Sequence, residues 1–387
     1  MLLLKYTREQ YFRIWLAGVD GIGAKSFARL LKRYGSAEAV WEGFGAEMRW
    51  IGPLAWQEMK AAHSRDTASE MVERVEHCGA TVVFQDDREY PPLLREIADP
   101  PALLYVRGRR DISDEWCIAI VGTRTPTAYG LRMARQISGE LARSGATVVS
   151  GFARGIDSAA HTAAVGAGGR TTAILGCGVD VIYPPENVEL FERILDMDGS
   201  IVSEFPPGSE PRGMHFPMRN RIISGMSRGV LMVEGLKGSG ALHTVKSAID
   251  QNREVFVLPG QVDSPTSETN HMLARDGARI ITSAVDILED LRAEALPRPK
   301  QTTLEEAVKT AQKPEPSIHP KEKSKVGKPR AAVEAVKPPV ELTDDESRVF
   351  AALESGQKSV DRLVELTGLS AAIVNTVLTT LAMKGIM

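Results

Sequence analysis

A short apolar run that ends in glycine stands at Cys117-Ile-Ala-Ile-Val-Gly122, and similar runs return along the chain with segments of helical periodicity between them. Buried strands that alternate with helices are typical of a parallel sheet covered on both faces. The pattern therefore predicts an α/β fold, an extended Rossmann-like, doubly wound, mostly parallel sheet with its core over residues 116–292. The further runs begin at Ala146, Thr171, Ser200, Gly229, Glu254 and Ala278. In such folds ligands bind beyond the carboxyl ends of the strands, where the strand order reverses.

The loop after the first run, which begins with Gly122, Thr123 and Arg124, has the composition of a phosphate cradle. Backbone amides and small hydroxyl side chains converge on an anion at a strand-to-helix turn, and the arginine adds charge. The loop does not match GxGxxG, and Ser150 ends the second strand where NAD-binding proteins have an acidic residue. We therefore expect no dinucleotide and no other cofactor.

Two further strand ends add groups for an anion. The loop after the second strand places Arg154 on the same edge, and the glycine-rich loop after the fifth strand offers Lys237 and Ser239. Three such sites on one edge exceed what a single small phosphate requires, so a polyanion is favoured.

The stretch Phe216-Pro-Met-Arg-Asn-Arg221 combines an aromatic ring with Arg219, Asn220 and Arg221 at a helix start. Single-stranded nucleic acid is bound by cations along its backbone and by rings on which bases stack. Alternatively, Phe216 belongs to the core and one of the arginines is structural, since alternate helix positions point in different directions.

Three residues invite a catalytic interpretation. Asp157 and His161 are four residues apart and share a helix face, which is compatible with an acid-base pair. A helix cap for Asp157 and local packing for His161 are favoured instead. Cys177 has no partner base in its motif, so a small buried side chain is the better interpretation. We expect no catalytic residue.

Composition sets the limits of these interpretations. The chain has 387 residues and a formal net charge of −3, so any polyanion site must be local. Its three cysteines lack CxxC spacing, which predicts neither a disulfide framework nor a metal site. The apolar start at Met1 is too short for a signal peptide or a membrane span. We expect a cytoplasmic protein that does not contact membranes.

Composition also divides the chain. Residues 1–90 are expected to be mainly helical, and Gly18-Val-Asp-Gly-Ile-Gly23 leads into a helix as in a helix-hairpin-helix unit. That helix start can hold a DNA phosphate, or Ile22 and Phe27 can form an ordinary core. Residues 91–292 complete the α/β domain. Residues 293–340, with eight Pro and ten Lys or Arg against six Asp or Glu, predict a flexible basic linker.

The tail, residues 341–387, predicts a helix-turn-helix in which Gly368-Leu-Ser370 turns into the last helix. It carries seven acidic and four basic residues, and its expected recognition helix has one cation. This charge disfavours a DNA reader, and with it a transcription regulator, and favours a protein-contact module or a vestige.

The chain resembles the DNA-processing protein A family, known as DprA or Smf, over the whole α/β segment with collinear spacing. The matching words are Gly122-Thr-Arg124, Tyr129-Gly130, Ser150-Gly151, Gly155-Ile-Asp157, His161, Leu175-Gly176, Gly178, Asp180, Tyr183-Pro184, Asn187, Ser203-Glu204, Phe216-Pro217, Arg219-Asn-Arg-Ile-Ile223, Glu234, Ser239-Gly240 and Pro259-Gly260. Two positions depart from the family pattern, His243 in place of an aliphatic residue and Glu268 in place of a frequent Gly. Each alters a loop or a helix start near the proposed site.

The resemblance implies three parts: a helical SAM-like domain, the Rossmann-like DNA-binding domain and a winged-helix-like domain. It implies a non-enzymatic mediator that binds and protects single-stranded DNA in natural transformation, helps to load RecA recombinase, and forms a homodimer through the Rossmann domain. By matching position, Arg124, Phe216, Arg219 and Arg221 would face DNA, with Arg154 and Lys237 as basic neighbours. The alternative is a nucleotide phosphoribohydrolase, but Pro259-Gly-Gln-Val-Asp-Ser264 does not match the Pro-Gly-Gly-x-Gly-Thr-x-x-Glu pattern typical of those enzymes.

Overall fold

The computed structural model describes residues 5–291 and positions 343, 345, 347–349, 364, 366–370, 373–374, 376–378 and 380. The chain divides into two compact units, Met1–Thr310 and Ala311–Met387. The expected linker over 293–340 lies outside the described residues.

Helices form the amino-terminal part, as expected. Thr7, Ser36 and Ser64 each cap a helix by accepting a hydrogen bond from a backbone N–H of its first turn. The glycine turn forms as well, with Gly21 at φ +83° and Gly23 at the start of the second helix. The elements are α1 (Arg8–Ala17), α2 (Ala24–Tyr34), α3 (Ala37–Glu42), the 3-10 helix η2 (Ala46–Ile51), α4 (Pro53–Ala62) and α5 (Arg65–His77).

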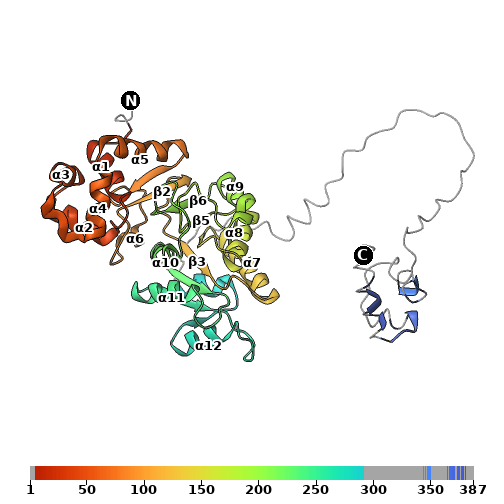
Figure 1. The fold of residues 1–387 in the computed structure, drawn as a ribbon. Helices are drawn as coiled ribbons and strands as arrows, with labels where there is room; N and C mark the ends of the chain where they lie inside the picture. The colour runs from red at the N-terminus through yellow and green to blue at the C-terminus, as the bar shows by residue number, and fades with distance from the viewer. Residues whose placement is uncertain are drawn as a thin grey trace, which may run out of the picture. The chain divides into compact units, whose positions relative to one another are not determined.

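One sheet of the described residues has the order β1-β2-β6-β5-β4-β3-β7-β8-β9 (Figure 1). Every strand pair formed among the seven strands numbered β3 to β9 is parallel. These strands coincide with the predicted runs, so the α/β prediction is confirmed. The strands are β1 (Thr81–Phe84), β2 (Leu103–Gly108), β3 (Cys117–Val121), β4 (Thr147–Ser150), β5 (Thr171–Ile174), β6 (Ser200–Ser203), β7 (Gly229–Met232), β8 (Glu254–Val257) and β9 (Arg279–Ile280).

Strands β1 and β2 are additions that the sequence pattern did not predict. Both pair antiparallel and extend the sheet beyond β6. The prediction rested on a repeat in which each parallel strand is followed by a crossover helix, and β1 and β2 are not part of that repeat. The sheet therefore begins at Thr81, within the segment that was expected to be helical.

Helices cover both faces of the sheet. Along β3, Ile118 and Ile120 pack in the cluster that includes α7 and α8, whereas Ala119 and Val121 pack in the cluster that includes α10 and α11. This alternation is the period of a strand buried on both faces. The remaining elements are α6 (Pro92–Arg95), α7 (Ala128–Arg143), α8 (Ile156–Gly166), η3 (Pro185–Asn187), α9 (Val188–Asp196), α10 (His215–Gly225), α11 (Ala241–Asp250), α12 (Glu268–Arg275) and α13 (Ala284–Asp290).

The described positions of the tail fit the expected turn. Gly368 has φ +68°, which glycine adopts readily, and its N–H donates to the Val364 carbonyl over 2.9 Å. The Ser370 hydroxyl accepts from the Ile373 N–H, as a helix cap does. Val374 is fully buried in the next helical segment.

Candidate nucleic-acid interface

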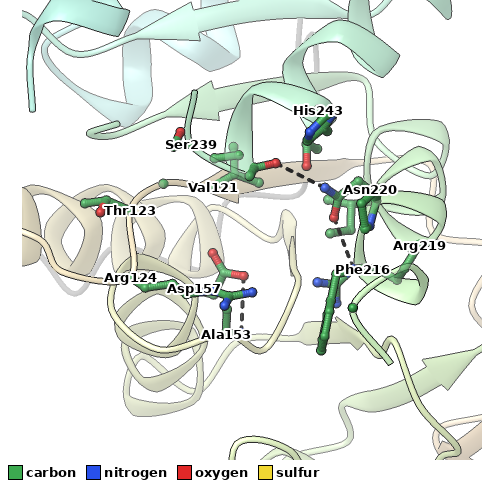
Figure 2. A pocket seen from close by; sticks show the side chains of 17 residues that line it. Val121, Thr123, Arg124, Ala153, Asp157, Phe216, Arg219, Asn220, Ser239 and His243 are labelled. Carbon is green, nitrogen blue, oxygen red and sulfur yellow. Dashed lines mark hydrogen bonds between the residues drawn. The ribbon is translucent and has the colours of Figure 1, made fainter. Parts of the chain in front are cut away.

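A pocket of 560 Å³ opens at the carboxyl ends of the parallel strands (Figure 2). It lies at β3, from which the strand order runs outward through β4 on one side and β7 on the other. This is the switch point where the sequence placed the site. Four segments line it: residues 121–124 after β3, Ala153 and Asp157 after β4, residues of α10 with the turn before it, and the start of α11 with Ser239.

A buried glutamate holds the loop after β3 in place. The Glu234 carboxylate, which is 2% exposed, accepts hydrogen bonds from the Thr127 N–H and hydroxyl over 2.9 and 2.5 Å. The Glu234 carbonyl accepts from the Thr123 N–H over 2.8 Å. A Cβ at Gly130 would collide with the same carboxylate. The sequence marked Glu234 only as part of a family motif, and its role as the clamp of this loop emerges from the structure.

Gly122 is required for packing. A Cβ there would stand 2.7 Å from Cγ1 of Ile156 and 2.9 Å from the Glu234 carbonyl oxygen. The absence of a side chain lets the ends of β3 and β7 and the start of α8 meet. Thr123, 6% exposed, lines the pocket beside it.

Arg124 and Phe216 meet at the mouth of the pocket. The Arg124 guanidinium stands 5.6 Å from the centre of the Phe216 ring, a cation–π contact. The ring packs over Gly176 and lies 5.7 Å from the Tyr183 ring. Arg124 is exposed, and no carboxylate of residues 5–291 pairs with it. We call Arg124 and Phe216 the rim.

Arg219 lies beneath the rim and is 4% exposed. Its Nη1 donates to the Gly151 carbonyl over 2.6 Å and to the Ile174 carbonyl, so it joins the ends of β4 and β5. A Cβ at Gly151 would stand 2.6 Å from Nη2, which explains the glycine. Burial lowers the pKa of Arg219 to about 10, opposed by the charge of Asp157, and the guanidinium remains charged at neutral pH.

Asp157 is not the helix cap that the sequence favoured: it lies in the first turn of α8, whose N-cap is Gly155 with no side-chain cap bond, and it holds the loop before the helix instead. Its carboxylate accepts from the N–H groups of Gly151 and Ala153 over 3.1 and 3.3 Å. Burial raises its pKa to about 6 even though Arg219 and these donors lower it. His161, fully buried, bonds Thr171 over 2.7 Å, and burial lowers its pKa to about 3, so it is neutral. We use the name floor for Arg219 and Asp157, which line the pocket, together with the fully buried His161, which does not line it.

Cys177 also matches the expectation of a small buried side chain. Its thiol is 2% exposed and donates to the Val181 carbonyl over 3.2 Å. Burial raises the pKa of Cys177 to about 12, which makes a thiolate nucleophile unfavourable at neutral pH.

Arg221 points away from the pocket. Two of its nitrogens bond the two Glu204 carboxylate oxygens over 2.8 and 2.6 Å, and Nε lies 3.2 Å from an Asp99 oxygen. These partners raise its pKa against the effect of burial. The structure thus separates the two arginines of α10, since Arg219 lines the pocket and Arg221 does not.

The other predicted site residues also divide into those that line the pocket and those that do not. Asn220 lines the pocket and donates to the Gly240 carbonyl over 3.2 Å. Ser239 also lines it, and its buried hydroxyl has no hydrogen-bond partner in the described structure. Arg154 is exposed outside the pocket and pairs with Glu186, with one contact at 3.0 Å. Lys237 is exposed in the loop that leads to Ser239.

The two departures from the family pattern lie differently. His243 lines the pocket from α11, whereas Glu268 begins α12 and is absent from the lining. Within the described ranges, no group of three His, Cys, Asp or Glu could hold a metal ion. In the same ranges no helix has the length and apolar character needed to cross a bilayer.

Comparison with known proteins adds a family and a fold. The family model for DNA recombination-mediator protein A matches residues 81–292, and the model for the DprA winged helix domain matches residues 333–386. Protein Smf from Synechocystis sp. is 38% identical over 294 residues, which cover 74% of this chain and 73% of that protein.

Two solved structures are similar. The X-ray structure of DNA processing protein A from Streptococcus pneumoniae has a TM-score of 0.62 and 30% identity, covering 74% of this chain and 99% of that one. A structure of DNA processing protein A from Helicobacter pylori, described for its single-stranded DNA binding mode, has a TM-score of 0.50 and 28% identity. It covers 56% of this chain and 98% of that one.

Proposed function

Because the chain belongs to the DNA recombination-mediator protein A family, we propose that it binds single-stranded DNA at the carboxyl-edge pocket without catalysing a reaction on it. The observation that carries the proposal is the rim, where an exposed arginine with no carboxylate partner in residues 5–291 lies over a ring. A phosphate can pair with the Arg124 guanidinium while a base stacks on Phe216 or on the guanidinium plane. Neither contact depends on base identity, so binding should be indifferent to sequence.

The floor supports a binding role. His161 is neutral and fully buried, and the Asp157 carboxylate accepts hydrogen bonds from two backbone N–H groups, so the fold already engages both side chains. The pocket therefore serves to bind a strand, through the charge of its phosphates and the rings of its bases.

The proposal extends to the cellular role that the family resemblance implies. The protein would protect incoming single strands in natural transformation, help to load RecA recombinase and act as a homodimer through the Rossmann domain, in the cytoplasm. Edge strand β9, with Ile280 61% exposed, is compatible with a second copy on that side. The free thiols of Cys78, Cys117 and Cys177 fit a reducing compartment.

The test is the affinity for a fluorescent thymidine oligomer across a salt series, measured by anisotropy for the wild type and for Arg124→Ala. Each phosphate contact of a single strand contributes a slope of about −0.7 in the plot of log affinity against log salt. Arg124→Ala should weaken binding about tenfold and reduce the slope by about 0.7. Equal binding of duplex and single strand by the wild type, or an unchanged slope in the variant, would refute the proposal.

A further inference from the structure

The amino-terminal helical domain carries a basic surface away from the carboxyl-edge pocket. Helix α2 contains four cations and no acidic residue, and η2 and α4 add one cation each. All six are exposed. We call the N-terminal patch the set Lys25, Arg29, Lys32, Arg33, Arg49 and Lys60 with two tryptophans, Trp50 and Trp56.

Cations and indole rings alternate across this patch. The Arg29 and Arg33 guanidinium groups stand 4.7 and 5.2 Å from the centre of the Trp50 ring. The guanidinium of Arg49, the residue before Trp50, stands 4.8 Å from the Trp56 ring, and the Lys60 ammonium stands 5.5 Å from the same ring. The two clusters are thus continuous through η2.

The charge of the patch is not used within the domain. No carboxylate of residues 5–291 forms an ion pair with any of the six cations. Glu38 and Glu42 of the neighbouring α3 both form ion pairs with Arg8, at 2.7 and 2.9 Å. Two acidic residues, Glu47 and Glu58, belong to the same elements as the patch. A local excess of cations that fold packing does not require suits a polyanion.

A groove adjoins the patch at Lys25 and adjoins the pocket at the segment around the start of α10. It measures 1010 Å³ and lies between the glycine turn before α2 and residues 204–218. Lys25 of the patch lines one wall, and the segment at the start of α10 forms the other. Because Gly213 and Phe216 of that segment line the pocket while Met214 and Met218 line the groove, the segment is a ridge shared by both. Met214 is 68% exposed on it.

We propose that a single DNA strand held at the carboxyl-edge pocket continues over this ridge and is bound a second time by the N-terminal patch. The inference rests on the proposed function and adds a second site to it. Lys25 to Arg33 extend over about 12 Å of α2, which is long enough to follow a strand beyond one phosphate. Interleaved rings favour a single strand over an acidic protein, because unpaired bases can stack on indoles and guanidinium planes.

The test compares a ten-nucleotide with a forty-nucleotide thymidine oligomer, both binding the full chain. In Arg29→Ala/Arg33→Ala the affinity for the long oligomer should fall about tenfold and its salt slope should shrink by about 1.4, while the short oligomer binds as it does to the wild type. The matched control, Arg143→Ala/Arg193→Ala, removes two exposed cations from the ends of α7 and α9 and should change neither affinity.

Two outcomes overturn the inference while the proposed function stands. One is an unchanged affinity of the double variant for the long oligomer. The other is that polyglutamate displaces the labelled long oligomer as effectively as an unlabelled thymidine oligomer does. The affinity of Arg124→Ala for the short oligomer tests the pocket separately, and it should fall. A second measurement does not depend on the stability of the double variant. The long oligomer should quench tryptophan fluorescence more than the short one, and Trp50→Phe should remove most of that difference. Equal quenching by both oligomers would also overturn the inference.

Discussion

The rim and the floor of the carboxyl-edge pocket use the same residue type in opposite ways. Arg124 on the rim is exposed and lies over a ring, with no carboxylate partner in residues 5–291. Arg219 on the floor is 4% exposed and donates to two backbone carbonyls. A cation contributes to ligand binding when its charge is unsatisfied in the free protein, and to stability when the fold already satisfies it. The rim should therefore govern affinity, and the floor should govern stability.

The largest effect is expected from Arg219→Met, which keeps most of the apolar volume and removes the donors. The carbonyls of Gly151 and Ile174 lose their partner and Asp157 loses its neighbouring positive charge. Removing one member of such a buried polar set costs about 3 kcal/mol of the free energy of unfolding. Urea denaturation measures it, with Arg124→Met as the matched control, expected within about 0.5 kcal/mol of the wild type. Equal losses in the free energy of unfolding for Arg219→Met and Arg124→Met would show that the rim and the floor do not differ in their contribution to stability.

The next effect is a pH dependence that belongs to the floor. Burial lowers the pKa of His161 to about 3 in the folded protein, whereas an unfolded histidine titrates near about 6.5. Below that pH the unfolded chain binds the extra proton, so stability is lost as pH falls from about 6.5 toward 3. Asp157, whose pKa burial raises to about 6, acts in the opposite sense, losing stability as pH rises from about 4 to 6.

The difference between the wild type and His161→Gln isolates the histidine. Between pH 7.5 and 5 the wild type should lose about 2 kcal/mol relative to the variant, because each pH unit below the unfolded pKa is worth about 1.4 kcal/mol. Denaturant melts at several pH values measure this difference. A constant difference would mean that His161 charges freely in the folded state and is not part of a dry floor.

The sequence predicted the place of Arg124 better than that of Arg221, for a physical reason. Arg124 follows a strand directly, and its place at the carboxyl edge follows from the alternation of strands and helices. The partners of Arg221 lie elsewhere in the chain, since Asp99 and Glu204 meet it only after β2 and β6 have paired. That antiparallel edge of the sheet lay outside the repeating pattern. Pairing of this kind is a tertiary contact with no local signal in the sequence.

A smaller effect separates the two members of the rim. Phe216→Leu keeps an apolar side chain and removes the ring, so it should weaken binding about tenfold, within the range of about 1 to 3 kcal/mol for one stacked base. Because no charge is lost, the salt slope should stay that of the wild type, unlike that of Arg124→Ala. Phe216→Tyr retains a ring and serves as the control. A slope that changes in Phe216→Leu would show that the ring acts only by positioning Arg124.

The smallest effect concerns Arg154, an exposed cation that is already paired. Its guanidinium bonds Glu186, and both side chains are about half exposed, at 47% and 49%. If pairing is what keeps a cation from contributing to affinity, Glu186→Ala should free Arg154 to reach a phosphate. Affinity for a single strand should then rise about twofold and the salt slope steepen by about 0.7. The double variant Glu186→Ala/Arg154→Ala should lose that gain. Weaker binding in Glu186→Ala would mean that the ion pair shapes the loop for DNA, and that pairing alone does not decide which arginines bind.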